Sequence, residues 1–232
     1  MTREMPNKLE TRIDGALELL DRQLLDVDGR MLGKVDDVEL AYTDQGLTVT
    51  ALLTGQVALL HRLGGDLGNE LASKYVQLRP SETHRSRPWR LPIDDVARLD
   101  SAVHLHVKRD EAVDRDTESF RLGTLTGMEV LEPEGERVGR VLDARFTPGQ
   151  HGRHVLSALV VGNGHPGSLL GYDRRPGMGP WVIRQAVGWL HRHTRLVDIE
   201  HTRILWNNEQ VHLDGPLADI GRSPVRDRDH NK

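Results

Sequence analysis

The chain has 232 residues with 31 basic and 35 acidic side chains, a formal net charge of −4 that gives no global attraction toward nucleic acid. Its apolar content of 37% is typical of a globular protein and argues against fibrous or fully disordered classes. Cysteine is absent, which excludes disulfides, thiolate nucleophiles and Cys-ligated metal clusters. No long apolar run and no apolar secretion signal is present, so the expected location is the cytosol.

The amino-terminal residues 1–15 lack a clear pattern, and we expect them to be flexible. A β-hairpin is predicted next, with strands over 23–27 and 30–40, because Asp28-Gly29 is a dipeptide typical of tight hairpin turns. Gly33 falls within the returning strand. A glycine there predicts a bulge or bend, which lets a short sheet curl.

A strand is expected over 47–53, a short helix over 56–63, and a strand pair of 91–93 with 103–107. Several short strands at turn-rich spacing favour a small barrel.

Two pairs of neighbouring aspartates occur in this part of the chain. Neighbours on a strand point to opposite faces, so neither Asp36-Asp37 nor Asp94-Asp95 predicts an acid–base pair. We expect Asp37 and its later counterpart Asp143 to bind backbone N–H groups, and Asp94 or Asp95 to fix a turn.

Residues 109–119 are charged and have almost nothing to bury, which predicts a linker or a solvated helical turn. The sequence then repeats itself at an offset of 106 residues, or 107 after one inserted residue. The second copy predicts a hairpin turning at 134–135, a strand over 155–161, and a strand pair of 197–199 with 211–213. In the opening hairpins alone, five identities align Leu25, Gly29, Gly33, Val35 and Asp37 with Leu131, Gly135, Gly139, Val141 and Asp143.

This period is the size of a small domain, so the sequence indicates a duplicated domain rather than a solenoid. The two copies, called here the first and second repeat, are expected over 16–108 and 120–213, and a disordered tail over 214–232. Their charges differ: residues 1–116 hold 16 basic and 21 acidic side chains, and residues 117–232 hold 15 and 14.

A helix is predicted over 180–195, longer than its counterpart in the first repeat. Its apolar side chains form one stripe, and basic side chains lie opposite. Burying six such apolar side chains against the protein's own barrel is worth on the order of 8 to 12 kcal/mol. Four net positive charges at an anionic lipid surface contribute roughly 4 kcal/mol. The magnitudes favour docking on the barrel, with the basic face left for an acidic partner.

Three motifs carry possible chemistry. Residues 162–167 match G-x-G-x-x-G after a strand, but Pro166 interrupts the helix that dinucleotide binding requires, so a turn is favoured. His104-x-His106 and His191-x-His193 have the spacing of metal pairs. No acidic residue lies at a helpful spacing to act as a third ligand, so exposed histidines are favoured and no metal or cofactor is expected.

The run LLDRQLLDVDGRMLGKVDDVE over 19–39 resembles the opening of PRC-barrel domains, and LPIDDV over 91–96 resembles their closing element. The second copy is similar but departs from the pattern at two places. Pro133 replaces a strand residue, and the segment 197–202 ends in Thr202 where the closing element of the first copy ends in Val96. This family includes the cytoplasmic domain of the photosynthetic reaction-centre H subunit and the carboxy-terminal domain of a ribosome maturation factor. The resemblance implies a mainly β protein of two tandem small PRC-type β-barrels, each with a short helix, used for docking and without a shared catalytic apparatus.

The leading hypothesis is a non-enzymatic adaptor that binds a protein partner through surface loops and the basic helix face. The alternatives are an RNA- or ribosome-associated factor and a protein on an anionic membrane surface, and a homodimer is also possible. The residues predicted to contact the partner are Arg174, Arg175, Arg184, His191, Arg192 and Arg195.

Overall fold

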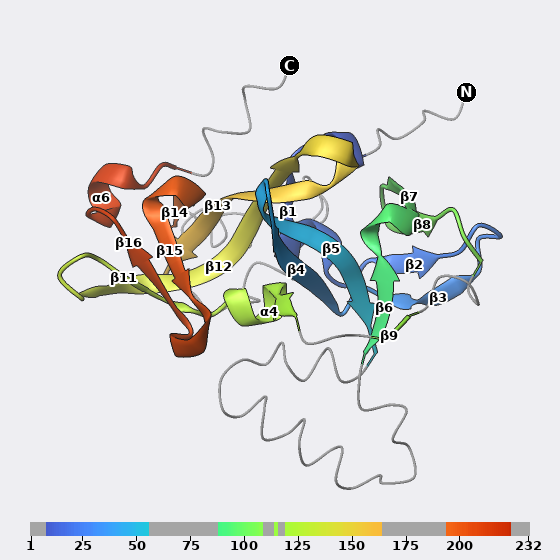
Figure 1. Ribbon diagram of the computed structural model, residues 1–232, viewed down its shortest axis with the longest axis horizontal. Coiled ribbons are helices and arrows are strands. Elements are labelled where there is room, and N and C mark those ends of the chain that lie inside the picture. Colours follow the sequence, from blue (N-terminus) through green and yellow to red (C-terminus); the bar gives the residue numbers. More distant parts are fainter. Residues whose placement is uncertain (1–7, 56–87, 109–113, 116–118, 164–193, 224–232) are drawn as a thin grey trace, which may run out of the picture. The chain divides into compact units, whose positions relative to one another are not determined.

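The computed structural model describes residues 8–55, 88–108, 114–115, 119–163 and 194–223 (Figure 1). Over these residues the protein is mainly β, and every helix is short. The chain divides into two compact units. Unit 1 consists of residues 1–124 with 146–156, and unit 2 consists of residues 125–145 with 157–232.

One sheet of unit 1 has four strands in the order β3-β2-β8-β7. The predicted hairpin turn is confirmed, since β2 and β3 pair antiparallel and Asp26 Oδ1 holds the turn by accepting N–H groups from Asp28 and Arg30. The returning strand expected over 30–40 is wrong in its extent, because the chain leaves this sheet after Lys34 and residues 37–40 belong to a strand of the other sheet. The ladder skips one residue beside Gly33, which confirms the predicted bulge. Strand β8 pairs with β2 in parallel and with β7 antiparallel. The strands are β2 (Gln23–Leu25), β3 (Met31–Lys34), β7 (Val96–Leu99) and β8 (Ala102–Leu105).

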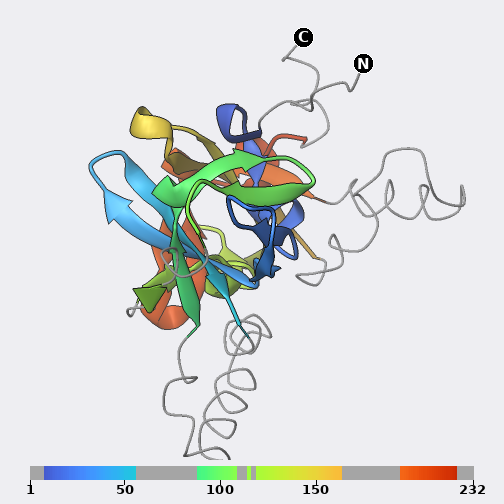
Figure 2. The ribbon, with the colours of Figure 1, turned by 90° about the vertical axis from the view of Figure 1, so that its right-hand side faces the viewer.

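Beside this sheet, the other strands of unit 1 curl around a long hairpin (Figures 1 and 2). Strands β4 (Asp37–Thr43) and β5 (Gly46–Thr54) form the hairpin. The free side of β5 pairs with β6 (Trp89–Pro92), and β6 pairs with β9 (Asp114–Arg115). The other side of β4 pairs with β10 (Phe120–Arg121).

Two long strands contribute to both units. They are β12 (Arg137–Pro148) and β13 (His154–Gly162), joined by the helical turn η5 (Gln150–Gly152). Their tip, residues 146–156, belongs to unit 1, where Val155 pairs with Thr48 of β5.

Unit 2 repeats the order of the four-stranded sheet. Strand β11 (Glu129–Leu131) pairs with β12, with the same one-residue skip beside Gly139. Strand β16 (Gln210–Leu213) joins β11 in parallel, and β15 (Thr202–Leu205) pairs with β16 antiparallel. Strand β14 (Arg195–Asp198) pairs with β13. The hairpin, its parallel neighbour and the antiparallel strand beyond therefore recur in both copies.

The remaining elements are short. They are η1 (Lys8–Glu10), β1 (Ile13–Asp14), η2 (Gly15–Leu19), η4 (Ile93–Asp95), α4 (Leu122–Leu125), η6 (Ile199–His201), η7 (Trp206–Asn208) and α6 (Leu217–Ile220). None of the helices in the described part of the chain is long and apolar enough to cross a membrane.

Mostly aliphatic side chains form the cores, and the long strands β4, β5, β12 and β13 are buried in continuous runs. In unit 1 the fully buried side chains include two from the second repeat, Leu122 and Phe146. In unit 2, side chains of three strands form one apolar cluster, consisting of Leu142, Ala158, Val160 and Leu196.

The expected pairing of 91–93 with 103–107 is wrong. Leu91 pairs instead with Leu52, and Val103 pairs with Leu99. The reason is local: η4 redirects the chain after Pro92, and Asp100 Oδ1 then accepts the Ala102 N–H at 2.9 Å, which closes a new hairpin between β7 and β8.

The same correction applies to the second copy, where 197–199 was expected to pair with 211–213. Val197 pairs with Leu159, and Val211 pairs with Ile204. The turn η6 follows β14 as η4 follows β6, so both repeats deviate from the expectation for the same reason.

Ordered structure extends into the three segments that the sequence marks as flexible, linking or disordered. Ile13 is buried, β9 lies in the linker, and α6 lies in the tail. In the tail, Leu217 N–H donates to Glu132 Oε1 and Arg222 exchanges backbone hydrogen bonds with Leu196. Composition misses the tail because these contacts of Leu217 and Arg222 are made by backbone groups rather than by apolar side chains. The helices predicted over 56–63 and 180–195 lie outside the described residues.

Candidate functional site

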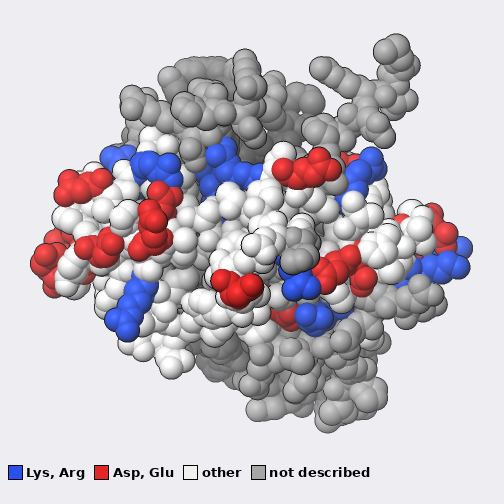
Figure 3. Space-filling model, turned by 45° about the horizontal axis from the view of Figure 1, so that its top comes forward, with Lys and Arg blue, Asp and Glu red and all other residues white. Residues whose placement is uncertain are grey.

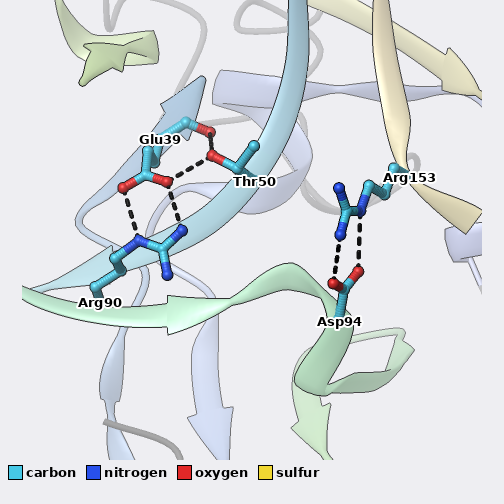
Figure 4. A network of polar contacts seen from close by, with 5 residues as sticks. All are labelled: Glu39, Thr50, Arg90, Asp94 and Arg153. Atoms are coloured by element: carbon cyan, nitrogen blue, oxygen red, sulfur yellow. Dashed lines mark hydrogen bonds and ion pairs between the residues drawn. The ribbon is translucent and has the colours of Figure 1, made fainter. Parts of the chain in front are cut away.

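A polar cluster forms on β4 of unit 1 around Glu39 (Figure 4). The Arg90 guanidinium on β6 donates from Nε to Glu39 Oε2 and from Nη2 to Glu39 Oε1, both at 2.8 Å. Thr50 on β5 donates its hydroxyl to Glu39 Oε1 at 2.6 Å. Strand β10 brings Arg121 opposite Glu39 in the ladder. Four strands therefore meet at one buried carboxylate.

The electrostatics of Glu39 favour its ionised form. Burial acts to raise the pKa of this carboxyl, but the hydrogen bonds from Arg90 and Thr50, together with the Arg90 charge, hold the pKa below its usual value. A two-pronged pair between an arginine and a buried carboxylate is geometrically specific. Glu39 is thus an ionised anchor that fixes the spacing of β4, β5 and β6, because its lone pairs are already engaged.

A second carboxylate, Asp37, binds the chain after the linker. Its Oδ1 accepts the N–H of Val38 and, at 2.8 Å, the N–H of Gly123. In the second repeat, Asp143 Oδ1 accepts the N–H of Ala144 at 2.7 Å. The expectation that both aspartates bind backbone N–H groups is confirmed.

An exposed aromatic pair bridges β4 and the neighbouring strand β10. Tyr42 on β4 and Phe120 on β10 contact edge to face, with ring centroids 5.5 Å apart and an interplanar angle of 81°. Their exposed fractions are 57% and 36%. Phe120 is in register with Leu40, so Tyr42 is its diagonal neighbour across the ladder. We call these two residues the aromatic patch.

One ion pair in unit 1 involves Asp94, which the sequence singles out. Arg153 at the tip of β13 donates to both carboxylate oxygens of Asp94, with the shorter distance 2.6 Å. The hydrogen bond from Arg153 lowers the pKa of Asp94. Asp94 therefore holds an arginine side chain, where the sequence predicted that it or Asp95 fixes a turn.

The first predicted histidine pair is divided between two carboxylates. His104 Nε2 lies 3.1 Å from Asp100 Oδ1, and Arg98 also pairs with Asp100. His106 is more exposed and lies 3.8 Å from Asp95. Among the residues with described coordinates, no group of three His, Asp or Glu side chains could hold a metal ion.

One buried histidine was not anticipated. His154 on β13 is 2% exposed, and its Nε2 donates to the backbone carbonyl of Thr11 at 3.1 Å. Burial lowers its pKa, and the hydrogen bond to Thr11 only partly offsets that effect. Its position, equivalent to Leu47 in the first repeat, was the available signal, because a polar residue replaces an aliphatic one there.

Most of the predicted partner-binding residues lie outside the described residues. These are Arg174, Arg175, Arg184, His191 and Arg192, and the pair His191-x-His193 and the end of the G-x-G-x-x-G motif lie there too. Arg195 is described: it begins β14, pairs with Val161 in the ladder and is half-buried.

Sequence reasoning also missed the aromatic patch. Tyr42 continues the apolar alternation of β4 past the point where the strand is covered, and Phe120 directly follows the charged linker, so both carried a weak signal. In comparisons with known proteins, no family model and no curated protein matches this chain.

Proposed function

We propose that this protein is a non-enzymatic docking protein built from two PRC-type barrels, and that it binds a protein partner through the aromatic patch of unit 1. The barrel assignment is supported by the recurrence in both copies of a bulged hairpin followed by a parallel strand. The two sheets of unit 1 curl toward each other as a small barrel requires (Figure 2).

The observation that carries the partner-binding proposal is the position of the exposed aromatic pair. Tyr and Phe side chains left in water are enriched where protein interfaces form, and rigid aromatic anchors supply much of the binding energy there. The bonds of Glu39 with Arg90 and Thr50 fix the strands beneath the patch, so little conformational entropy is lost when a partner covers it.

A protein fits this surface better than RNA does. Phosphate recognition needs a basic field, whereas acidic and basic side chains are interspersed on the face in Figure 3. The described arginine on β6, Arg90, is committed to Glu39. Exposed aromatic side chains are instead enriched in protein–protein contacts.

The experiment is quantitative affinity purification of the tagged full-length protein from native lysate. The test variant is Tyr42→Ser with Phe120→Ser, and the matched control is Met31→Ser, which removes another exposed apolar side chain of unit 1. A third variant, Arg184→Glu with Arg192→Glu, tests the basic face predicted for 180–195. Circular dichroism verifies that each variant folds.

We expect the patch variant to lose a partner that the Met31→Ser control retains, and the purified partner to bind the wild type at least tenfold more tightly than the patch variant. Identical partner sets for wild type and patch variant would refute the aromatic patch as the docking surface. Loss of partners only from the arginine variant would move the site to the second repeat. A salt-sensitive shift of RNA by the wild type, with no protein retained, would favour the RNA-binding alternative.

A further inference from the structure

Unit 1 contains two segments of the second repeat, residues 120–124 and 146–156, here called the exchange segments. We infer that these segments are an obligatory partner for the first repeat, so that the two repeats are bound to each other and are not independent barrels on a string. This inference does not depend on the proposed function, because it concerns the hairpin β4–β5 and what completes it.

The first exchange segment, residues 120–124, pairs alongside β4 and binds the residue at which β4 begins. Phe120 and Arg121 pair with Leu40 and Glu39 of β4, and Gly123 N–H donates to Asp37 Oδ1 at 2.8 Å. The fit is close: a Cβ atom added at Gly123 would lie 2.9 Å from Asp37 Oδ2 and 3.3 Å from its Cγ. Since Asp37 is fully buried, it has little room to yield. Gly123 is therefore required by packing, whatever its backbone conformation.

The second exchange segment covers the other end of the hairpin. Val155 pairs with Thr48 of β5, and Gln150 N–H donates to Gln45 Oε1 at 2.7 Å. Arg153 reaches Asp94 of the first repeat, as described above. Three kinds of contact, a ladder pair, a side-chain hydrogen bond and an ion pair, thus join the tip of β12–β13 to first-repeat residues.

The ladder pair joins equivalent positions. Val155 lies 107 residues after Thr48, which is the repeat offset in this part of the chain. An antiparallel pair between a residue and its own equivalent is the local contact that two copies of one strand make about a twofold axis. The pairing of β5 with β13 therefore has the form of a contact between two partner molecules, here joined in one chain.

The test severs the linker of the full-length protein. A protease recognition sequence placed at residues 116–118 gives, after cleavage, two fragments that correspond to the first repeat and to the second repeat with both exchange segments. We expect the cleaved protein to elute from a sizing column as one species at micromolar concentration, and an affinity tag on either fragment to retain both. Separation of the fragments under native conditions would overturn the inference.

A pair of variants tests whether the exchange segments hold the two fragments together. Gly123→Ala places a methyl group against Asp37, whereas Gly215→Ala in unit 2 places one at an ordinary 3.4 Å from Ile220. We expect Gly123→Ala to weaken fragment association by about 5- to 100-fold, the range that overpacking a close contact typically gives. Gly215→Ala should leave it within about twofold of wild type.

The uncleaved chain keeps the test free of folding artefacts. A short tether supplies an effective concentration in the millimolar range, so uncleaved Gly123→Ala should retain the wild-type circular dichroism spectrum. Equal association of the fragments in the two glycine variants would overturn the inference that the exchange segments hold the two repeats together. Partner binding by the aromatic patch is measured on the uncleaved protein, so the proposed function and this inference fail separately.

Discussion

The two repeats share a fold-determining set of residues and differ in what they expose. Gly33 and Gly139 lie beside the same ladder skip. The Ser157 hydroxyl donates to the Arg145 carbonyl at 3.1 Å, and the hydroxyl of the equivalent Thr50, which donates to Glu39 Oε1, lies 3.5 Å from the Glu39 carbonyl. Four exposed apolar side chains among the described residues of the first repeat have no aliphatic or aromatic equivalents. At the positions of Val27, Met31, Tyr42 and Trp89, the second repeat has Pro133, Arg137, Pro148 and Arg195.

This difference distinguishes the residues that the fold requires from exposed residues that it does not require. If the barrel required exposed aromatic side chains at its rim, both repeats would carry them. Tyr42 lies in the first repeat and Phe120 in the second, and at the repeat offset from them the chain has Pro148 and Asp14. Because neither aromatic residue recurs in the other copy, we infer that the pair is kept for a contact outside the fold. The buried polar position changes too, because Glu39 in the first repeat corresponds to Arg145 in the second. The comparison can be tested by substitutions at equivalent positions.

The largest effect is expected at the equivalent core positions Leu40 and Phe146, both fully buried and both in unit 1. Phe146→Ala should lower the free energy of unfolding by about 3 to 5 kcal/mol and Leu40→Ala by about 2 to 5 kcal/mol, because each leaves a cavity. Urea denaturation followed by circular dichroism measures both. The exposed control Asp44→Ala should change stability by less than about 0.5 kcal/mol. A small effect at Phe146 alone would show that unit 1 does not need the second repeat.

The second-largest loss of stability is expected on breaking the ion pair between Arg90 and Glu39, which has no equivalent at the matching positions of the second repeat. Arg90→Ala leaves the buried carboxylate of Glu39 without its main partner and should cost about 2 to 4 kcal/mol. At the equivalent position the second repeat has Leu196. Adding Glu39→Gln to Arg90→Ala should recover part of the loss, since it removes the uncompensated charge. If the double variant is as unstable as the sum of the two single variants, the two side chains are not coupled.

A smaller, pH-dependent effect is expected from His154, which replaces the aliphatic Leu47 of the first repeat. The pKa of His154 is lowered in the folded protein, so the unfolded chain binds a proton more readily. This contribution to stability is present above the unfolded pKa of about 6.5 and is lost as the pH falls below it. Denaturation curves between pH 7.5 and 5 should therefore show falling stability.

The control for this pH effect is His154→Leu, which installs the first-repeat residue and should flatten the curve. The exposed His201 acts in the opposite direction, since its hydrogen bond with Asp214 raises its pKa. Its stabilising contribution is present at low pH and is lost as the pH rises through the folded pKa. An unchanged slope in His154→Leu would assign the pH dependence to other groups.

The smallest effect is expected at the exposed Asp94–Arg153 pair. Asp94→Ala should lower stability by less than about 1 kcal/mol, because solvent and side-chain entropy offset most of the attraction between exposed charges. The difference from wild type should vanish in 1 M salt, where the Debye length falls to about 3 Å. A large or salt-independent loss would show that this contact between the repeats is a structural anchor.

Local features of the site could be read from the sequence, and its assembly could not. Asp28-Gly29, the bulges at Gly33 and Gly139, and the backbone-binding role of Asp37 follow from turn chemistry and spacing. The cluster around Glu39 could not be predicted, because Arg90 lies 51 residues away and Gly123 lies 86 residues from Asp37. No periodic pattern encodes which distant strands become neighbours.

By itself the sequence determined a mainly β chain made of two related copies with bulged hairpins, since glycine placement and strand alternation act over a few residues. Only the tertiary structure decided that β6 pairs with β5, that Tyr42 and Phe120 meet, and that residues 146–156 belong to unit 1. The physical reason is that backbone hydrogen bonds in a sheet are the same for every strand. Partner choice therefore depends on the packing of whole faces, which no single segment specifies.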